Sequence, residues 1–365
     1  MVRFINERNY AHETPKRMGV LITNLGTPAS PSPKDVRKYL AEFLGDARVV
    51  EVPRLVWMAI LHGVVLRTRP KKSAEAYQEV WGEDGSPLLQ IGLKQRDALR
   101  ESLSTYLDDS EVQVELAMRY GEPSIGSVLE KMRQNNVRRL LVLPLYPQYS
   151  ATTTAATIDE VTRVLRTWRW LPELRTTNQY HDEDGYIDAI ADSVRQHRAE
   201  KGAGEKLLFS MHGIPKRNLL SGDPYHCQCH KTARLVADRL GLPDDAWALS
   251  FQSRLGKAEW LKPYTDTVLE EWAAEGVKTV DVLCPGFSAD CLETLEEVAM
   301  EYAELFEEKG GKSLNYIPAL NDRPEHIEFL TQFVLDKLSG WHHIKDDAEA
   351  LENTRERAVA MGAER

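Results

Sequence analysis

Short, nearly continuous apolar segments recur along this chain and alternate with longer amphipathic stretches. Strands that are covered on both faces have apolar runs of this kind, whereas strands with one face in water alternate. The amphipathic stretches have the periodicity of crossover helices. The sequence therefore predicts an α/β fold with parallel sheets between helix layers. The expected strands cover residues 19–26, 112–120, 138–146, 206–213, 246–253, 279–287 and 313–320.

A weak internal repeat indicates two similar halves. Residues 140–161 and 279–298 share a strand, a proline, an aromatic loop, a helix start with small residues and an acidic finish. Residues 20–28 and 207–215 match in strand, glycine and proline. Because ligands of open parallel sheets bind outside the carboxyl ends of the strands, we predict two Rossmann-like domains with the active cleft between them.

The expected domain division follows from breaks in the pattern. The N-terminal α/β domain is placed at 1–170 and the C-terminal α/β domain at 171–322, because residues 165–185 interrupt the helical pattern. Residues 323–340 are expected to form a helix that packs back across both domains. Residues 341–365 are charged and low in large apolar side chains, which predicts a solvated helix or a disordered tail.

Composition and charge exclude several classes of partner. The formal net charge is -10 and the sequence pI is about 5.6, so no nucleic acid is expected to bind. No signal peptide and no run of ~20 apolar residues is visible, and the cysteines are expected to stay reduced, which favours a cytoplasmic protein. The strand ends NLGTP, RYGEP and MHGIP lack the glycine pattern of a dinucleotide or nucleotide site.

Polar residues at two strand ends are the candidates for chemistry. His212 ends the strand in LLFSMHGIP, and an acidic helix follows the strand that leads into CPGF. If Asp290 caps that helix, Glu293, Glu297 and Glu301 form one ridge along it. Their repulsion is costly unless a cation visits, so the row could conduct a divalent ion or relay protons. Two simpler interpretations stay open, which are acidic residues that complement the helix dipole and a histidine bonded to a backbone carbonyl.

The segment His226–His230, HCQCH, also resembles a metal site at first sight. Zinc sites usually space paired ligands as C-x₂₋₄-C and add a second pair elsewhere. No second pair is evident, so a structural metal is disfavoured there and the role of the segment stays open.

Seven long strings follow one another along the chain: RMGVLITNLGTP, RPKKSAEAYQEVWGEDGSPL, AMRYGEPSI, LPLYPQYSATTTA, LLFSMHGIPKRNLLSGDPY, SFQSRLGKAEWLKPYTD and CPGFSADCLETLEEVAMEY. In this order they resemble the ferrochelatase family, which catalyses the last step of haem synthesis. The resemblance runs from about Arg17 to about Leu338. It implies insertion of Fe²⁺ into protoporphyrin IX to give protohaem, with release of two protons, in a Gram-negative type of enzyme.

The resemblance also assigns roles to residues. His212 matches the active-site histidine and Glu293 the essential helix carboxylate, and both would act in catalysis and on the metal. A proton or metal relay would consist of Asp290, Glu297 and Glu301. The porphyrin-binding set would be Leu25, Arg119, Tyr120, Trp260 and Phe287, although Arg119 could equally form a surface ion pair.

The apolar segment 49–69 resembles the lip of the family's active-site mouth. It could admit a porphyrin dissolved in a membrane, shield a bound one, or be an ordinary buried helix. Peripheral membrane contact and contact with the preceding enzyme of the haem pathway are therefore both open.

Two departures limit the resemblance to animal members. These carry a two-iron two-sulfur cluster with one cysteine after YPQYS, where this chain has Ala151, and no cysteine follows Cys291. No such cluster, and no cofactor beyond the substrate Fe²⁺, is expected. Cys291 also stands where animal sequences have a histidine.

Three functions stay open at this point. The first is a protoporphyrin ferrochelatase. The second is a coproporphyrin ferrochelatase or another tetrapyrrole metal chelatase. The third is a tetrapyrrole-binding protein without catalysis, which turnover would distinguish from the other two.

Overall fold

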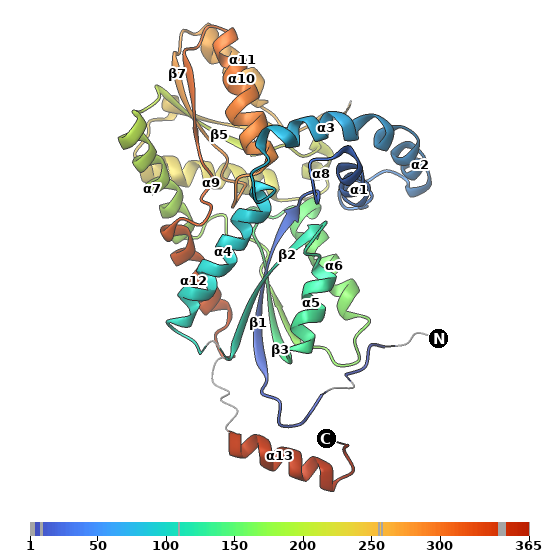
Figure 1. Cartoon of the computed structure of the whole chain (residues 1–365). Helices are drawn as coiled ribbons and strands as arrows, with labels where there is room; N and C mark the ends of the chain where they lie inside the picture. Colours follow the sequence, from blue (N-terminus) through green and yellow to red (C-terminus); the bar gives the residue numbers. More distant parts are fainter. Residues whose placement is uncertain are drawn as a thin grey trace.

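Two parallel four-stranded sheets form the centre of the molecule (Figure 1). The computed structural model describes residues 4–7, 10–108, 110–254, 256, 258–341 and 348–364. The first sheet has the order β2-β1-β3-β4 and the second the order β6-β5-β7-β8, with every pair parallel. Both halves thus repeat one topology, which confirms the predicted fold class. The strands are β1 (Arg17–Gly26), β2 (Val112–Tyr120), β3 (Val137–Pro144), β4 (Glu173–Thr176), β5 (Lys206–His212), β6 (Trp247–Gln252), β7 (Thr279–Leu283) and β8 (Ser313–Ile317).

Helices cover both faces of each sheet, which explains the continuous apolar runs of the central strands. Val20, Leu21 and Ile22 of β1 are all fully buried. Because successive side chains of a strand point to opposite faces, both faces of β1 are covered. The helices of the first half are α1 (Pro33–Phe43), α2 (Arg54–Ile60), α3 (Leu66–Val80), α4 (Pro87–Ser104), α5 (Ile125–Gln134) and α6 (Ala156–Leu165), with π-helical turns η1 (Leu61–Val65) and η2 (Ala151–Ala155).

The second half has corresponding helices and a longer π-helix. They are α7 (Asp184–Lys201), α8 (Lys216–Leu220), α9 (Tyr225–Leu240), η3 (Asp244–Ala246), α10 (Thr265–Ala274), the π-helix η4 (Glu293–Glu301) and α11 (Tyr302–Glu308). The chain continues into α12 (Pro324–Lys337) and α13 (Ala348–Ala360). Both η2 and η4 follow the third strand of their sheet, in the two segments that the internal repeat had paired.

The strand β4 was missed by the sequence prediction. Its four residues, Glu-Leu-Arg-Thr, pair only with β3 at the edge of the sheet. An edge strand this short contains no apolar run, so only the pairing identifies it. The first sheet consequently extends beyond residue 170, where the sequence had placed the end of the first domain.

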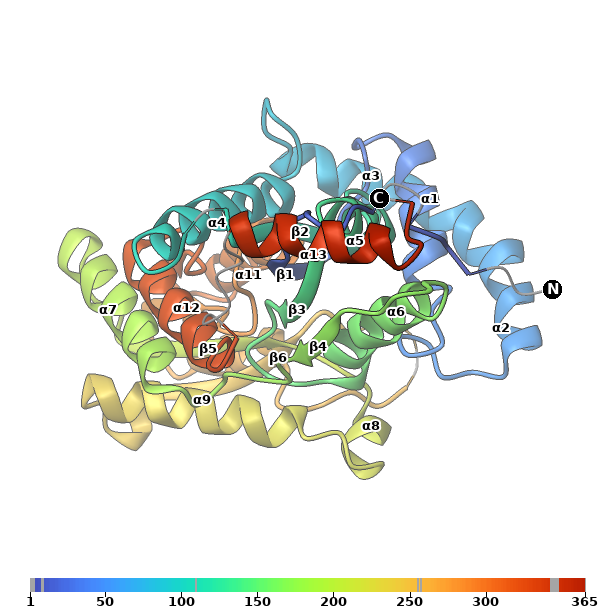
Figure 2. The same cartoon turned by 90° about the horizontal axis from the view of Figure 1, so that it is seen from below.

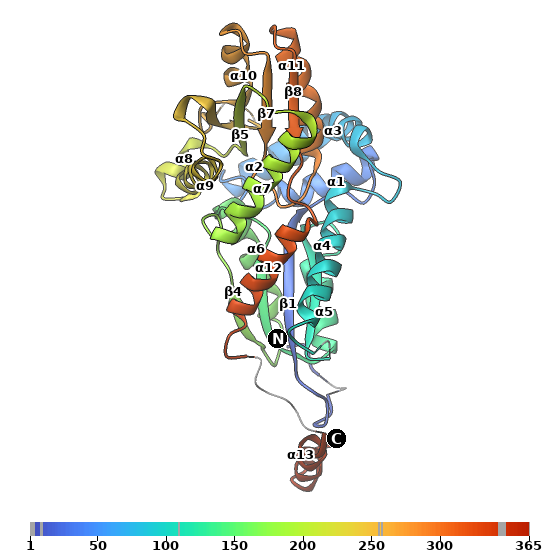
Figure 3. The ribbon, with the colours of Figure 1, turned by 90° about the vertical axis from the view of Figure 1, so that its left-hand side faces the viewer.

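Helix α12 joins the two halves. It lies against α4 of the first half and α7 of the second (Figure 3). Its buried side chains, among them Leu330 and Phe333, belong to one core with residues of both halves. By contrast, α13 has no buried residue and lies below the first sheet in Figure 1, in front of it in the view from below in Figure 2. Of the predicted tail, residues 342–347 lie outside the described residues, and Ala348–Ala360 form this helix.

We expect Leu330→Ala to lower the free energy of unfolding by about 2–5 kcal/mol, because it removes a fully buried side chain from the core that α12 shares with both halves. Urea unfolding followed by circular dichroism measures this difference. Leu220→Ala is the matched control, since Leu220 is 77% exposed and its truncation should change stability by less than about 0.5 kcal/mol. A loss in Leu330→Ala no larger than in this control would contradict the assigned packing.

Candidate active site

A cleft of about 720 Å³ lies between the two halves. Side chains from the carboxyl ends of β1, β3, β5 and β7 all contribute to its wall, as the position of ligand sites in parallel sheets predicts. The wall is largely apolar and aromatic, which suits a flat hydrophobic ligand. Leu25, Trp260 and Phe287 of the predicted porphyrin-binding set are part of it.

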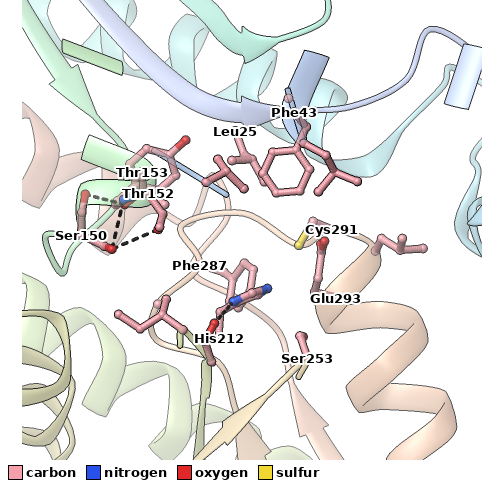
Figure 4. Close-up of a pocket in the computed structure, with 18 of the residues that line it drawn as sticks. Leu25, Phe43, Ser150, Thr152, Thr153, His212, Ser253, Phe287, Cys291 and Glu293 are labelled. Atoms are coloured by element: carbon pink, nitrogen blue, oxygen red, sulfur yellow. Dashed lines mark hydrogen bonds between the residues drawn. The ribbon is translucent and has the colours of Figure 1, made fainter. Parts of the chain in front are cut away.

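His212 is the last residue of β5 and points into the cleft (Figure 4). Its Nδ1 lies 2.6 Å from the carbonyl oxygen of Gly213. A carbonyl only accepts, so Nδ1 carries the proton and the neutral ring has its lone pair on Nε2. The hydrogen bond from His212 to a backbone carbonyl, which was the simpler interpretation of this residue, is therefore present. It also fixes the tautomer whose Nε2 can act as a base.

Gly213 and Gly26, which the internal repeat pairs, are both required by close backbone contacts. A Cβ on Gly213 would lie 2.7 Å from the carbonyl oxygen of Gln252, and one on Gly26 would lie 1.8 Å from that of Tyr120. Each glycine thus lets the chain leave the first strand of its half in close contact with the backbone of the neighbouring strand. This turn places Leu25 and His212 on the rim of the cleft.

Glu293 begins η4 and lines the cleft beside Cys291 (Figure 4). Buried Gln252, which pairs in register with His212, donates from Nε2 to the Glu293 carbonyl at 2.9 Å. Burial, with the Glu293 charge nearby, raises the pKa of the Cys291 thiol well above its usual value. Cys291 is therefore a protonated packing residue of the wall.

The carboxylates after Glu293 run from the cleft toward the surface. Glu297 accepts hydrogen bonds from the backbone N–H of Ser253 and from the hydroxyl of Tyr302, both at 2.8 Å. Ser253 itself lines the cleft. Glu301 is exposed at the end of η4. Glu293, Glu297 and Glu301 therefore all lie on one helix, which is a π-helix instead of the α-helix that the four-residue spacing assumed.

Asp290 does not belong to this row. It is buried and accepts hydrogen bonds from the Tyr316 hydroxyl at 2.5 Å, the Asn321 side-chain amide at 2.8 Å and the Thr294 hydroxyl at 3.1 Å. Leu292, not Asp290, is the N-cap of η4. The expected cap is therefore wrong, and the surrounding donors give Asp290 a structural place beneath the first turn of η4.

Asn321 connects this carboxylate to the rest of the molecule. Its side-chain oxygen accepts from the Asp290 N–H at 2.8 Å, and its own N–H donates to the Ser288 carbonyl at 3.0 Å. Its carbonyl accepts from Gln95 of α4 at 3.0 Å and lies 2.7 Å from Nδ1 of His326 on α12. The start of η4 is thus held by residues of both halves.

Arg119 and Tyr120 lie outside the cleft lining. Asp46 accepts hydrogen bonds from the guanidinium of Arg119 and, at 2.9 Å, from the hydroxyl of Tyr120. Tyr120 packs edge-on against Phe43, a residue of the cleft wall, with ring centroids 5.2 Å apart. Both residues thus support the wall of the cleft instead of facing a ligand.

Several cleft residues were not predicted. Ser150, Thr152 and Thr153 line the cleft after β3, and the rule for strand ends could have found them. Tyr39 of α1 and Arg69 of α3 also line it, but a lone residue on an amphipathic helix gives no signal in the sequence. Arg69 is partly buried, which lowers its pKa, and no carboxylate within the described ranges pairs with it.

The HCQCH segment forms the first turns of α9, outside the cleft lining. Its cysteines are free thiols, with Cys227 exposed and Cys229 buried. Throughout the described part of the chain, no three histidine, cysteine or acidic side chains form a group that could hold a metal ion.

Two α/β halves with a base and an acidic helix at a shared cleft define a chelatase-type fold. SirB from Bacillus subtilis, whose structure was determined with Fe³⁺, shares this fold with a TM-score of 0.52 at 11% identity, over 88% of this chain and 96% of that one. The family model Ferrochelatase matches residues 17–338. The chain belongs to the ferrochelatase family, as its motifs had indicated.

Two curated relatives, both named ferrochelatase, extend this similarity over nearly the full length. The relative from Thioalkalivibrio sulfidiphilus is 53% identical and aligns over 99% of this chain and all of its own length. The relative from Marinobacter nauticus is 56% identical over 94% of this chain and 93% of its own.

Glu296 should make the folded state less stable as the pH rises. Burial, with Glu301 and Glu297 nearby, raises the pKa of Glu296 to about 7, whereas in the unfolded chain it titrates near 4.3. Between these values the folded state binds more protons, so the unfolding free energy falls with rising pH. Relative to the wild type, Glu296→Gln should therefore gain stability from about pH 4.5 to pH 8.

Urea midpoints measured across this pH range test the trend. Glu304→Gln, a change at an exposed glutamate of α11, is the control and should run parallel to the wild type. Equal offsets of Glu296→Gln from the wild type at pH 4.5 and pH 8 would contradict the raised pKa.

Proposed function

We propose that the chain inserts Fe²⁺ into protoporphyrin IX to give protohaem, with release of two protons. The observation that supports this most is the pairing of His212 and Glu293 in one apolar cleft between the two halves. The cleft has the volume of a site for a ligand of drug size or larger. Family membership makes the reaction class the expected one.

The reaction exchanges protons for a metal ion without a redox change. Both pyrrole N–H bonds of the neutral macrocycle break, and the resulting dianion binds Fe²⁺ through its nitrogens. His212 accepts a proton on Nε2, while the Gly213 carbonyl holds its Nδ1 proton and stabilises the imidazolium that forms. Glu293 supplies an anionic oxygen that can replace water on the incoming ion or take the second proton.

The acidic row gives protons or metal ions a path between this site and the surface. Glu297 binds Ser253 of the wall and Glu301 is exposed, so the helix carries carboxylates from the cleft to the surface. Asp290 takes no part in this path and instead fixes the first turn of η4.

Rigid walls serve the difficult step, which is to reach the nitrogen lone pairs of a planar ring. These lone pairs lie in the ring plane, so an approaching ion meets them only when the macrocycle is bent. Buried aromatic side chains such as Tyr39 and Tyr146, with Trp260 and Phe287, can hold a bent macrocycle and thereby favour the transition state over the flat substrate.

The cations of the cleft favour a ring with few carboxylates. In the described part of the wall, the cationic side chains are those of Arg69 and Arg217. Two guanidinium groups match the two propionates of protoporphyrin IX. Coproporphyrin has four propionates, so two of its carboxylates would lie unpaired against an apolar wall, which costs desolvation free energy.

His212→Ala should reduce metal insertion by at least about 10²-fold, because it removes the proton acceptor, while the apolar wall still binds the porphyrin. Anaerobic incubation with Fe²⁺ and protoporphyrin IX, followed by the loss of porphyrin fluorescence, measures insertion. His197→Ala is the control, since His197 of α7 lies outside both the cleft lining and the lip 49–69.

The same assay with coproporphyrin III separates the alternative functions. Faster insertion of Fe²⁺ into coproporphyrin III than into protoporphyrin IX would show that coproporphyrin is the substrate instead. Tight binding of both porphyrins without insertion by the wild type would instead indicate a carrier.

The mouth of the cleft has an apolar surface that we propose contacts a membrane. Leu55 of α2 is 89% exposed and Val64 of η1 is 57% exposed. Exposed Arg54, Arg67 and Lys71 flank them, so the surface combines apolar insertion with attraction to anionic lipid. No helix in the described ranges is long and apolar enough to cross a membrane. Such contact would let an apolar porphyrin enter from lipid instead of from a preceding enzyme of the pathway.

The double change Leu55→Glu with Val64→Glu should weaken binding to anionic vesicles by at least about tenfold, since each apolar side chain contributes about 1.5–3 kcal/mol on burial. Co-sedimentation with phosphatidylglycerol-containing vesicles measures it. Leu171→Glu, at a residue that is 55% exposed outside this surface, is the control. Unchanged sedimentation of the double variant would exclude the surface, and equal loss in the control would show a general charge effect.

A further inference from the structure

Two histidines near the start of α9 form an arrangement that the proposed reaction does not use. His226 and His230 are four residues apart, so they lie on one face of the helix. Their ring centroids are 4.5 Å apart with an interplanar angle of 52°. His226 is partly exposed and His230 is exposed, so an ion from solvent can reach both.

This separation fits two ligands on one ion. With metal–nitrogen bonds of about 2.0–2.1 Å, two imidazoles at roughly a right angle have ring centroids about 4.5 Å apart. A pair of histidines at this spacing on a helix is also the half-site that binds Zn²⁺ in helical metal motifs. The observed centroid separation therefore matches that of two imidazoles bound to one ion.

One of the two rings, that of His226, packs against a buried aromatic side chain. Phe251 restrains the first ring, which stacks on it at an interplanar angle of 16° and a centroid distance of 5.8 Å. A restrained ligand loses less conformational entropy on binding.

We propose that His226 and His230 form a second metal site that takes borderline divalent ions such as Ni²⁺, Cu²⁺ and Zn²⁺. Imidazole ligands suit these ions, whereas Mg²⁺ and Ca²⁺ need oxygen. Water completes the coordination, because no third protein ligand lies in the group among the described residues. Cys227 is exposed and lies three residues before His230, but it forms no three-ligand group with the two histidines, so the proposed site uses two nitrogens and no thiolate.

The site is separate from the cleft but close to it. Tyr225, which precedes His226, lines the cleft and donates to the carbonyl oxygen of His212 at 2.9 Å. A test of the second site must therefore exclude binding at His212. The His212→Ala protein provides this background, and Ni²⁺ is the probe.

Isothermal titration of His212→Ala protein with Ni²⁺ should give one bound ion. Adding His226→Gln or His230→Gln should weaken the Ni²⁺ affinity by at least tenfold, since even the loss of an outer-shell partner lowers metal affinity about 10–100-fold. Adding His62→Gln, a change at a lone exposed histidine, or Cys227→Ser should leave the affinity unchanged. Mg²⁺ should not compete.

Each opposite result would overturn the proposal. Ni²⁺ affinity that survives both glutamine changes would place the ion elsewhere, and an equal loss in Cys227→Ser would indicate a thiolate site. In a chain with native His212, the variant with both His226→Gln and His230→Gln should still insert metal into porphyrin. Failure of the second site is thereby distinguishable from failure of the proposed reaction.

Discussion

Strands β1 and β5 lie in the middle of sheets that helices cover on both faces, and this burial limits where polar chemistry can occur. Side chains along the two strands face an apolar core, and an unpaired polar group there would cost several kcal/mol. Polar side chains that are available to bind a ligand or react therefore lie at the carboxyl ends of the strands. Because both sheets direct these ends toward the same cleft, His212 and the wall of the opposite half come together without any long loop between them.

The internal repeat shows how one architecture presents different side chains to the cleft from its two halves. In each half a π-helical turn follows the third strand, η2 after β3 and η4 after β7. Thr152 and Thr153 line the cleft from the first turn, and Glu293 lines it from the second. π-Helical turns are uncommon and often mark functional sites. The carboxylate row thus stands on a scaffold that the other half uses for neutral hydroxyl groups.

The sequence predicted seven of the eight described strands because continuous apolar runs mark buried strands. It also placed His212 at a strand end and Glu293 in the helix after a later apolar strand, and both positions line the cleft. The short edge strand β4 has no run to detect. The helix cap expected at Asp290 is wrong because its spacing to Glu293 fits a cap, whereas its partners Tyr316 and Asn321 are distant in sequence. Arg119 shows the same limit, since its place behind the wall depends on Asp46 from another element.

The contacts of Asn321 explain how the second half can present a carboxylate at a fixed position while the mouth of the cleft stays open. Gln95 of α4, His326 of α12 and the loop at Ser288 all meet at its backbone, and its side chain binds Asp290 below the first turn of η4. These groups are buried, so breaking one bond leaves a partner unsatisfied. In the lip, Trp57 Nε1 donates to the Leu44 carbonyl at 2.6 Å, while Leu55 and Val64 are exposed. The carboxylate is thus held by bonds from both halves, whereas the lip presents apolar side chains to its surroundings.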